Sequence, residues 1–300
     1  METHEFNLIT GVPTIIGGLY GKEQRILTEQ NGKSFQQKLY YLLASVTKKV
    51  GDVDIQSLSD KEREDFFKNM LSADRKKILI MTQRFSYDFD PYFIFTYKYV
   101  NSETQKEDQI VKRLDISGGF PETPLKKFDE NILKGKTFSE LKELQGDKLK
   151  ELQDSIPDVQ CSNYEEVLQY KTILIELPKT KIRVELTLID GMGESIGGST
   201  KKEDRSSHTA LLMRQPRRLM AKPEEENNGH YNKINITKAE LDKLPVMDIE
   251  YMRKAVQIFE PRVDTEFRFE APDGDTTAEG RYVVSDVLHQ LSFFYPSETT

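Results

Sequence analysis

Two aspartates in this 300-residue chain, Asp90 and Asp264, occupy the same place in two similar stretches and are the candidates for acid–base chemistry. Each follows a segment with helical periodicity and precedes one with strand alternation, and 174 residues separate them. Two carboxyl groups brought together between two halves of a protein could donate and accept a proton. Aspartate also binds backbone N–H groups where a strand or turn begins. The sequence favours this structural role and leaves the acid–base pair as the alternative.

The glycine-rich stretch 191–198 (GMGESIGG) has the composition of a phosphate-binding loop. A dinucleotide-binding loop, G-x-G-x-x-G, needs glycine where Ile196 stands, and a P-loop needs lysine where Ser199 stands. We therefore expect an ordinary loop after a strand and no bound cofactor.

The four histidines and the single cysteine form no metal-binding or nucleophile motif. No histidine lies at ligand spacing from another histidine or from the cysteine, so no metal is expected. The cysteine lacks a neighbouring histidine or asparagine signature, so it is expected to be an inert thiol, and no catalytic residue is assigned. These residues are His4, His208, His230, His289 and Cys161.

Two short clusters are candidates for contact with a partner. Arg214, Arg217 and Arg218 form a basic cluster that could touch nucleic acid or a partner protein. The aromatic triplet Phe293, Phe294 and Tyr295 stands beside a polar terminus, where it either closes a core or docks into a neighbouring subunit.

Two stretches of related sequence must position these residues: LSADRKKILIMTQRFSYDFDPYFIF (71–95) and LPVMDIEYMRKAVQIFEPRVDTEFRF (244–269). Each begins with apolar residues at helical period and ends with strand alternation, and Ser72 is expected to cap the first helix. Without a gap, six positions are identical, among them Asp74 with Asp248 and Gln83 with Gln257. This match predicts an internal duplication.

The predicted fold is α+β, with two pseudo-repeated halves that each contain short strands, a helical bundle and a β-hairpin. The first half spans 1–120 and includes helices at 22–29, 33–49 and 60–70, the last with the capping box Ser59–Glu62, and a hairpin over 91–116. A charged helical connection, more solvated than the halves, spans 121–165. The second half, 166–300, opens with a hairpin of YKTILIEL and IRVELTLI.

Composition restricts the classes of partner. A net charge of −7 argues against a general polyanion binder. No run of 18 apolar residues and no signal-peptide pattern is present, so synthesis in the cytoplasm and no membrane partner are expected.

Several segments in a fixed order resemble the baseplate-hub and tail-assembly proteins of T-even-type contractile-tailed bacteriophages and of phage-like contractile injection systems. The resemblance covers GGLYGKEQRILTEQNG and the 71–95 stretch in the first half, and LPKTKIRVELTLIDGMGE, VDTEFRFEAPDG and SFFYP in the second. Many relatives carry a C-x-x-C pair at the hairpin turns, whereas these turns begin at Tyr99 and Ala271 and contain no cysteine. A zinc role is therefore not carried over.

The resemblance implies a non-enzymatic protein of virion morphogenesis, either a structural component of the baseplate hub or an assembly chaperone. Its partners would be other baseplate or tail proteins, met in the host cytoplasm during assembly and in the virion baseplate if the protein is retained. Nucleic acid and small-molecule substrates are not expected. The alternatives are a nucleotide- or metal-dependent enzyme with a site between the halves, and a nucleic-acid-associated binding module that uses Arg214, Arg217 and Arg218.

The docking role of the aromatic triplet can be tested by the double substitution Phe293→Ala with Phe294→Ala. We expect weaker co-purification with a co-expressed hub, tail-spike or tape-measure protein and an unchanged unfolding midpoint in urea. If the variant unfolds instead, the rings belong to the core and the docking interpretation is wrong.

Overall fold

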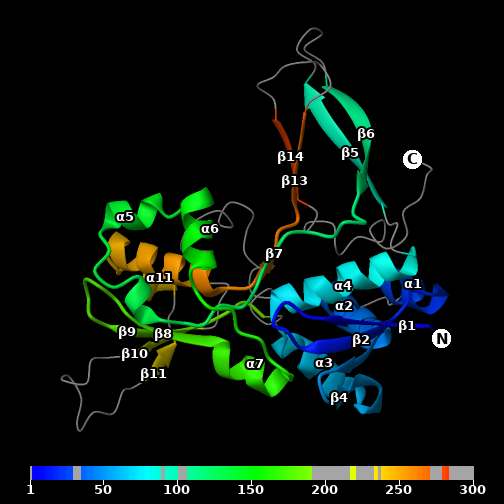
Figure 1. Cartoon of the computed structure of the whole chain (residues 1–300), viewed down its shortest axis with the longest axis horizontal. Helices are drawn as coiled ribbons and strands as arrows, with labels where there is room; N and C mark the ends of the chain where they lie inside the picture. Colours follow the sequence, from blue (N-terminus) through cyan, green and yellow to red (C-terminus); the bar gives the residue numbers. More distant parts are fainter. Residues whose placement is uncertain are drawn as a thin grey trace.

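The computed structural model describes residues 2–29, 35–88, 92–100, 107–190, 217–220, 233–235, 238–270 and 279–283. The fold is α+β, as predicted: helices pack on two four-stranded antiparallel sheets, one in each half, and two long hairpins rise from the body (Figure 1). The buried apolar side chains of the described residues form two clusters, one centred on each half, and the first also includes Val167, Leu188 and Val263 of the second half.

The N-terminal sheet is a meander in the order β1-β2-β3-β4. Its strands are β1 (Thr3–Asn7), β2 (Pro13–Gly17), β3 (Thr47–Val50) and β4 (Val53–Asp54). The turn between β1 and β2 needs a glycine, because Gly11 has a φ of 91° and a Cβ there would lie 2.4 Å from Oε1 of Gln160.

Four helices enclose the first core: α1 (Gly21–Glu29), α2 (Phe35–Val46), α3 (Asp60–Asn69) and α4 (Ser72–Ser86). The short 3₁₀ helix η1 (Ile55–Ser57) precedes α3. The capping box at α3 is confirmed, since the side chains of Ser59 and Glu62 each accept from the backbone N–H of the other.

Two predicted helices of this half are present, but the predicted end of one and the predicted cap of the other were wrong. The helix predicted over 33–49 ends at Val46, because Thr47–Val50 pairs with β2 as strand β3. Ser72 does not cap α4; it is the first helical residue, Leu71 precedes it, and no side chain caps that end. The N–H of Ser72 instead donates to the carbonyl of Ile189, 2.9 Å away in the other half.

The C-terminal sheet has the order β11-β10-β9-β8. Its strands are β8 (Thr172–Glu176), β9 (Arg183–Thr187), β10 (Arg217–Met220) and β11 (Lys233–Asn235). The predicted hairpin of β8 and β9 is confirmed. The helices around the second core are α5 (Phe138–Glu143), α6 (Gly146–Asp154), α10 (Lys238–Leu241) and α11 (Val246–Phe259). Helices α5 and α6 pack on α11.

The connection between the halves is charged and helical, as predicted, and it also supplies side chains to both cores. Leu125 and Val159 belong to the first core, and Leu141 and Leu149 to the second. Helix α7 (Tyr164–Tyr170) then leads into β8, and the side chain of Tyr164 is buried against the first half. The segment predicted to be a solvated linker is therefore part of the packed body. The residue boundaries of the three segments remain a prediction.

Polar contacts join the halves. Strand β7 (Glu122–Thr123) pairs with β12 (Arg262–Val263), and Leu71 forms a β-bridge with Asp190. Nζ of Lys171 donates to Oδ2 of Asp190 at 2.5 Å and to the carbonyl of Asn69 at 2.8 Å, and both ionic side chains are more than 90% buried. The backbone between α3 and α4 is thus fixed to the chain on either side of the β8–β9 hairpin.

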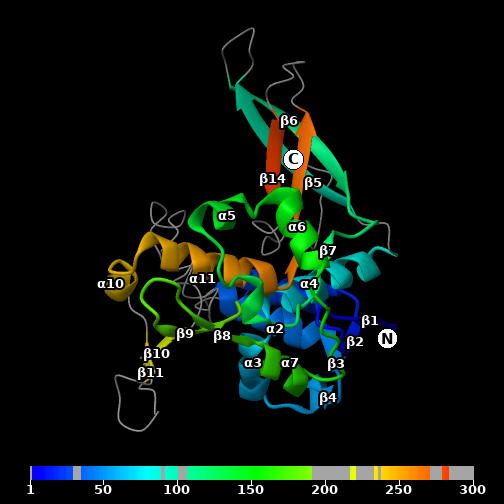
Figure 2. The ribbon, with the colours of Figure 1, turned by 60° about the vertical axis from the view of Figure 1, so that its left-hand side comes forward.

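Two hairpins extend from the body in the same direction and lie side by side in both views (Figures 1 and 2). The first pairs β5 (Tyr92–Val100) with β6 (Glu107–Asp115), which confirms the hairpin predicted over 91–116. The second pairs β13 (Glu266–Glu270) with β14 (Glu279–Val283). One follows α4 and the other follows α11.

The order of elements is similar in the two halves. Each has a four-stranded sheet in chain order, a helix that leads to a long helix, and then a hairpin, but in the first half α1 and α2 are inserted between β2 and β3. This order supports the duplication inferred from sequence, which remains a prediction.

The ion pair of Lys171 and Asp190 gives a test of the contact between the halves. Lys171→Met leaves the Asp190 carboxylate in a buried site without its balancing cation, so we expect the free energy of unfolding to fall by about 3–5 kcal/mol. The double variant with Asp190→Asn removes the buried charge and should recover part of that loss in urea titrations. Equal losses in the single and double variants would contradict the pairing.

Candidate functional site

The two hairpins are the candidate functional feature, and the helices at their bases determine where they stand. Helix α4 ends at Ser86, shortly before β5, and α11 ends at Phe259, shortly before β12 and β13. Each helix carries a fully buried aspartate at its third position, Asp74 in α4 and Asp248 in α11. Negative charge in the first turn of a helix is stabilised by the helix dipole.

Asp74 holds the turn between β1 and β2. Its Oδ1 accepts from the N–H of Thr10 at 3.2 Å, and its Oδ2 accepts from Oγ1 of Thr10 at 2.9 Å. The hydroxyl of Tyr164 also donates to Oδ2 at 3.2 Å while it accepts from the N–H of Leu71 at 2.6 Å. One carboxyl group at the start of α4 therefore contacts both the turn between β1 and β2 and Tyr164 at the end of the connection.

Asp248 makes the corresponding contact in the second half. Its two carboxylate oxygens accept from the backbone N–H groups of Lys179 and Thr180, at 2.9 and 3.0 Å. Those residues form the turn between β8 and β9. The aspartates aligned by sequence thus have the same role, in which a helical carboxylate binds a hairpin turn.

Burial changes the protonation of the Asp74 network. Burial raises the pKa of Asp74 to about 6, although hydrogen bonds from Thr10 and Tyr164 act in the opposite direction. Burial, together with the charge of Asp74, raises the pKa of Tyr164 well above its ordinary value.

Cys161 lies beside this network and has the properties of a structural thiol. It is buried, and its backbone N–H donates to the carbonyl of Thr10 at 2.9 Å. Burial raises its pKa to about 11, with further contributions from Glu166 and Asp74. The thiol is therefore protonated at neutral pH.

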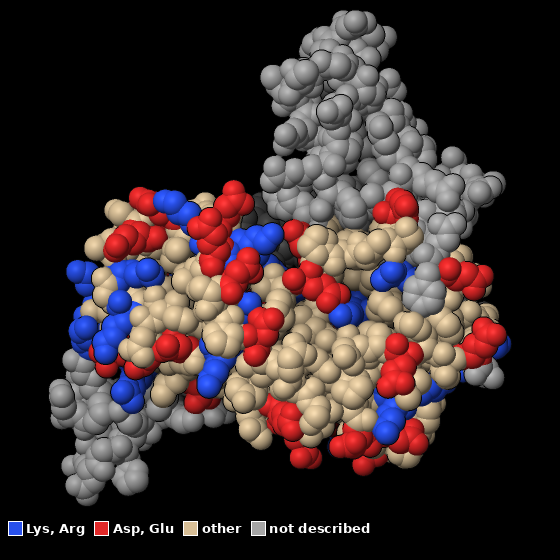
Figure 3. Space-filling model, in the orientation of Figure 1, with Lys and Arg blue, Asp and Glu red and all other residues tan. Residues whose placement is uncertain are grey.

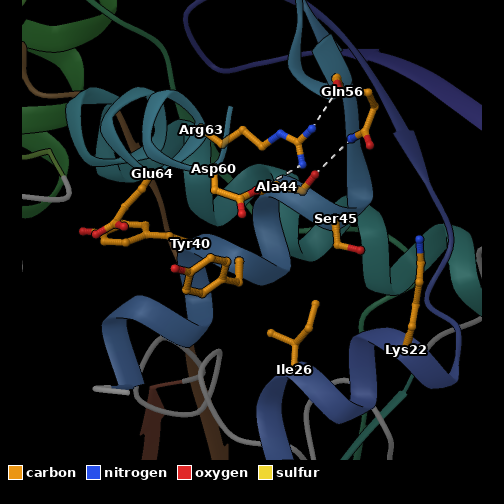
Figure 4. Close-up of a pocket in the computed structure, with 10 residues that line it drawn as sticks. Lys22, Ile26, Tyr40, Ala44, Ser45, Gln56, Asp60, Arg63 and Glu64 are labelled. Carbon is orange, nitrogen blue, oxygen red and sulfur yellow. Dashed lines mark hydrogen bonds and ion pairs between the residues drawn. The ribbon is translucent and has the colours of Figure 1, made fainter. Parts of the chain in front are cut away.

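A separate cavity of about 280 Å³ lies among α1, α2, η1 and α3 (Figure 4). Several of its polar side chains brace its walls. Nε2 of Gln56 donates to the carbonyls of Ala44 and Thr47, and Arg63 donates to the carbonyls of Ile55 and Gln56. The cavity lies within the N-terminal half, whereas the enzyme hypothesis places its site between the halves.

The structure places few of the residues singled out from sequence. Asp264 follows β12, and its backbone N–H donates to the carbonyl of Pro121 at 2.8 Å; Asp90 lies outside the described residues. His4 stacks on Phe6 and Phe85. Outside the described residues lie His208, His230, His289, the 191–198 loop, Arg214, Phe293, Phe294 and Tyr295.

Arg217 and Arg218 begin β10, opposite Leu186 and Glu185 of β9. Among the described residues no group of three or more histidine, cysteine, aspartate or glutamate side chains could hold a metal ion. No helix in the described part of the chain is long and apolar enough to cross a bilayer.

Sequence reasoning missed the buried ionic groups. Neither Lys171 nor Lys254 was singled out from sequence, yet Nζ of Lys254 is buried and donates to the carbonyl of Leu144 at 2.5 Å. Burial, aided by Arg253, lowers the pKa of Lys254. The partners lie far away in sequence, so no local pattern identifies these lysines.

Comparison with protein-family models, curated proteins and solved structures finds no match for this chain.

The raised pKa of Asp74 predicts a specific pH dependence. The folded chain retains a proton with a pKa of about 6, whereas the unfolded chain releases it at about 3.9. Ionised Asp74 therefore disfavours the fold above about pH 6, and this cost disappears as the pH falls below about 4. Relative to Asp74→Asn, the wild-type free energy of unfolding should rise by up to about 3 kcal/mol on acidification across this window. Parallel pH profiles in urea titrations would contradict the assignment.

Proposed function

We propose that this protein is a non-enzymatic structural or assembly protein of a contractile phage tail or injection-system baseplate, and that it holds other baseplate or tail proteins through its paired hairpins. The observation that carries the proposal is the pair of hairpins that project together from one packed body (Figures 1 and 2). The resemblance of the sequence to baseplate-hub and tail-assembly proteins supplies the class of partner.

The geometry of the β5–β6 hairpin suits recognition of another protein. Its strands are nine residues long, which corresponds to a length of about 30 Å. A two-stranded hairpin is marginally stable alone in water and gains stability by packing against another element. The aromatic alternation predicted from sequence, at Phe93, Phe95, Tyr97 and Tyr99, falls within β5, and aromatic residues are enriched in protein interfaces.

The body has the construction of a rigid support. Two cores, a strand pair between β7 and β12, and the buried pair of Lys171 and Asp190 hold the halves together. The described surface carries interspersed acidic and basic side chains on the face seen in Figure 3. Such a surface favours specific contact over general attraction to a polyanion.

Shortening each hairpin tests this role. One variant replaces residues 95–112 with Asn-Gly, which joins the paired residues Ile94 and Arg113 in a two-residue turn. The matched variant replaces residues 268–281 and joins Phe267 to Tyr282. We expect at least one variant to lose co-purification with a hub, tail-spike or tape-measure protein that binds the full chain.

Each shortened variant should keep the helical circular dichroism of the full chain, which shows that the body is folded. If a purified partner binds both shortened variants as tightly as the full chain, the hairpins do not form the binding site.

A thermal-shift series with ATP and with Mg²⁺, Mn²⁺ or Zn²⁺ tests the enzyme alternative, because a ligand at 100 times its Kd stabilises the fold by about 2.7 kcal/mol. Such stabilisation would contradict the proposed function.

A further inference from the structure

We propose that the outer edge of β8 is a self-association site, at which two copies of this chain pair their β8 strands antiparallel and join their C-terminal sheets. The edge belongs to the four-stranded sheet of the C-terminal half (Figure 1). It is separate from the hairpins, and the inference does not depend on the proposed function.

The hydrogen bonds at both ends of β8 show which backbone groups face outward. The carbonyl of Lys171 accepts from the N–H of Leu188, and the N–H of Leu177 donates to the carbonyl of Ile182, both at 2.9 Å. These residues therefore face β9. Because this direction alternates along an antiparallel strand, Thr172, Leu174 and Glu176 direct their N–H and C=O groups away from β9.

The side chains of β8 alternate between solvent and the second core. Thr172, Leu174 and Glu176 are exposed, whereas Ile173 and Ile175 are each 1% exposed and belong to the second core. No described strand pairs with the outer edge of β8. The edge is therefore a row of accessible donors and acceptors above a well-packed core.

The other outer strands of the two sheets carry features that limit pairing. Strand β4 has two residues and β11 has three, the first of which is Lys233. Strand β1 includes His4 and Glu5. Short strands and charged residues are the usual protection of sheet edges. Strand β8, with the sequence TILIE, has five residues, no lysine, no proline and one charge at its end.

Exposed apolar side chains gather near the same edge. The described residues include five exposed large hydrophobic side chains, and three of them are Leu168, Tyr170 and Leu174. Leu168 and Tyr170 belong to α7, which leads directly into β8. With a two-fold axis at Leu174, the exposed Leu174 side chains of the two copies would lie side by side.

The strand can pair with a second copy of itself without opposing like charges, which favours a second copy as the occupant. Antiparallel pairing about a two-fold axis at Leu174 places Leu174 opposite Leu174 of the second copy, and Ile173 opposite its Ile175. Glu176 then lies opposite Thr172, so like charges are not opposed. The axis is perpendicular to the sheet, so the isoleucines of both copies remain on the core face.

Cysteine cross-linking tests this register. A hydrogen-bonded antiparallel pair has its Cα atoms about 5.5 Å apart, within the range of a disulfide. Leu174→Cys should therefore form an intermolecular disulfide on mild oxidation. Thr172→Cys is the matched control: in this register the two Thr172 positions lie about 13 Å apart, too far for a disulfide. The native Cys161 is buried and serves as the background in both variants.

Sedimentation velocity tests the association without cross-linking. We expect wild-type protein to reach twice the chain mass of 34.7 kDa as its concentration rises. Leu174→Lys places two lysines opposite each other and should raise the dissociation constant at least about tenfold. Thr187→Lys, with the same charge change on β9, should leave the constant within about twofold of wild type.

Circular dichroism should show the same helical content in both lysine variants. Wild-type protein that is monomeric at every concentration, or a Leu174→Lys variant that associates as strongly as wild type, would overturn the proposal. Equal cross-linking of Leu174→Cys and Thr172→Cys would also overturn it, because the register would then be wrong.

Discussion

A carboxylate in the first turn of a helix, bound to the turn of an antiparallel hairpin, is the contact that organises both halves. Asp74 binds Thr10 in the first half, and Asp248 binds the N–H groups of Lys179 and Thr180 in the second. Both aspartates are fully buried. In the first half Thr10 is itself buried, and its N–H would be left an unsatisfied buried donor without Asp74, at a cost of about 1–3 kcal/mol. The contact therefore fixes each long helix against its sheet, and each helix fixes the base of a hairpin.

The connection between the halves makes these two units one body. The hydroxyl of Tyr164 donates to Asp74, and the N–H of Cys161 donates to the carbonyl of Thr10. The end of the connection therefore packs on the turn between β1 and β2. Helices α5 and α6 pack on α11 in the other half. A segment that contributes to both cores transmits the position of one half to the other, and the two long hairpins consequently leave the body side by side (Figure 2).

The sequence predicted the elements whose evidence is local. The capping box of Ser59 and Glu62, the strand β5 and the hairpin of β8 and β9 were each predicted from neighbouring residues, and each was confirmed. The sequence alignment of the two stretches also matches Asp74 with Asp248. Their common role could not be predicted, because the turns that they bind lie 64 and 68 or more residues away.

The failures have the same physical origin. The helix predicted to end at residue 49 stops at Val46, because Thr47–Val50 pairs with β2, a partner more than thirty residues away in the chain. Ser72 had the residue type of a helix cap, yet its N–H binds Ile189 in the other half. The connection was predicted to be solvated from its charge, but its leucines are buried in both cores. The buried lysines have no local sequence pattern that separates them from surface lysines. In each case a tertiary contact outweighed the local preference.

Native-state hydrogen exchange of three backbone amides, those of Thr10, Lys179 and Thr180, tests the role of the two aspartates most directly. If the carboxylates hold both turns, these amides should exchange only through unfolding of the body and be protected as strongly as amides in α4 and α11. Exchange at the rate of exposed turn amides would show that the turns open independently of the helices. That result would contradict the account of how the halves, and with them the hairpins, are held in place.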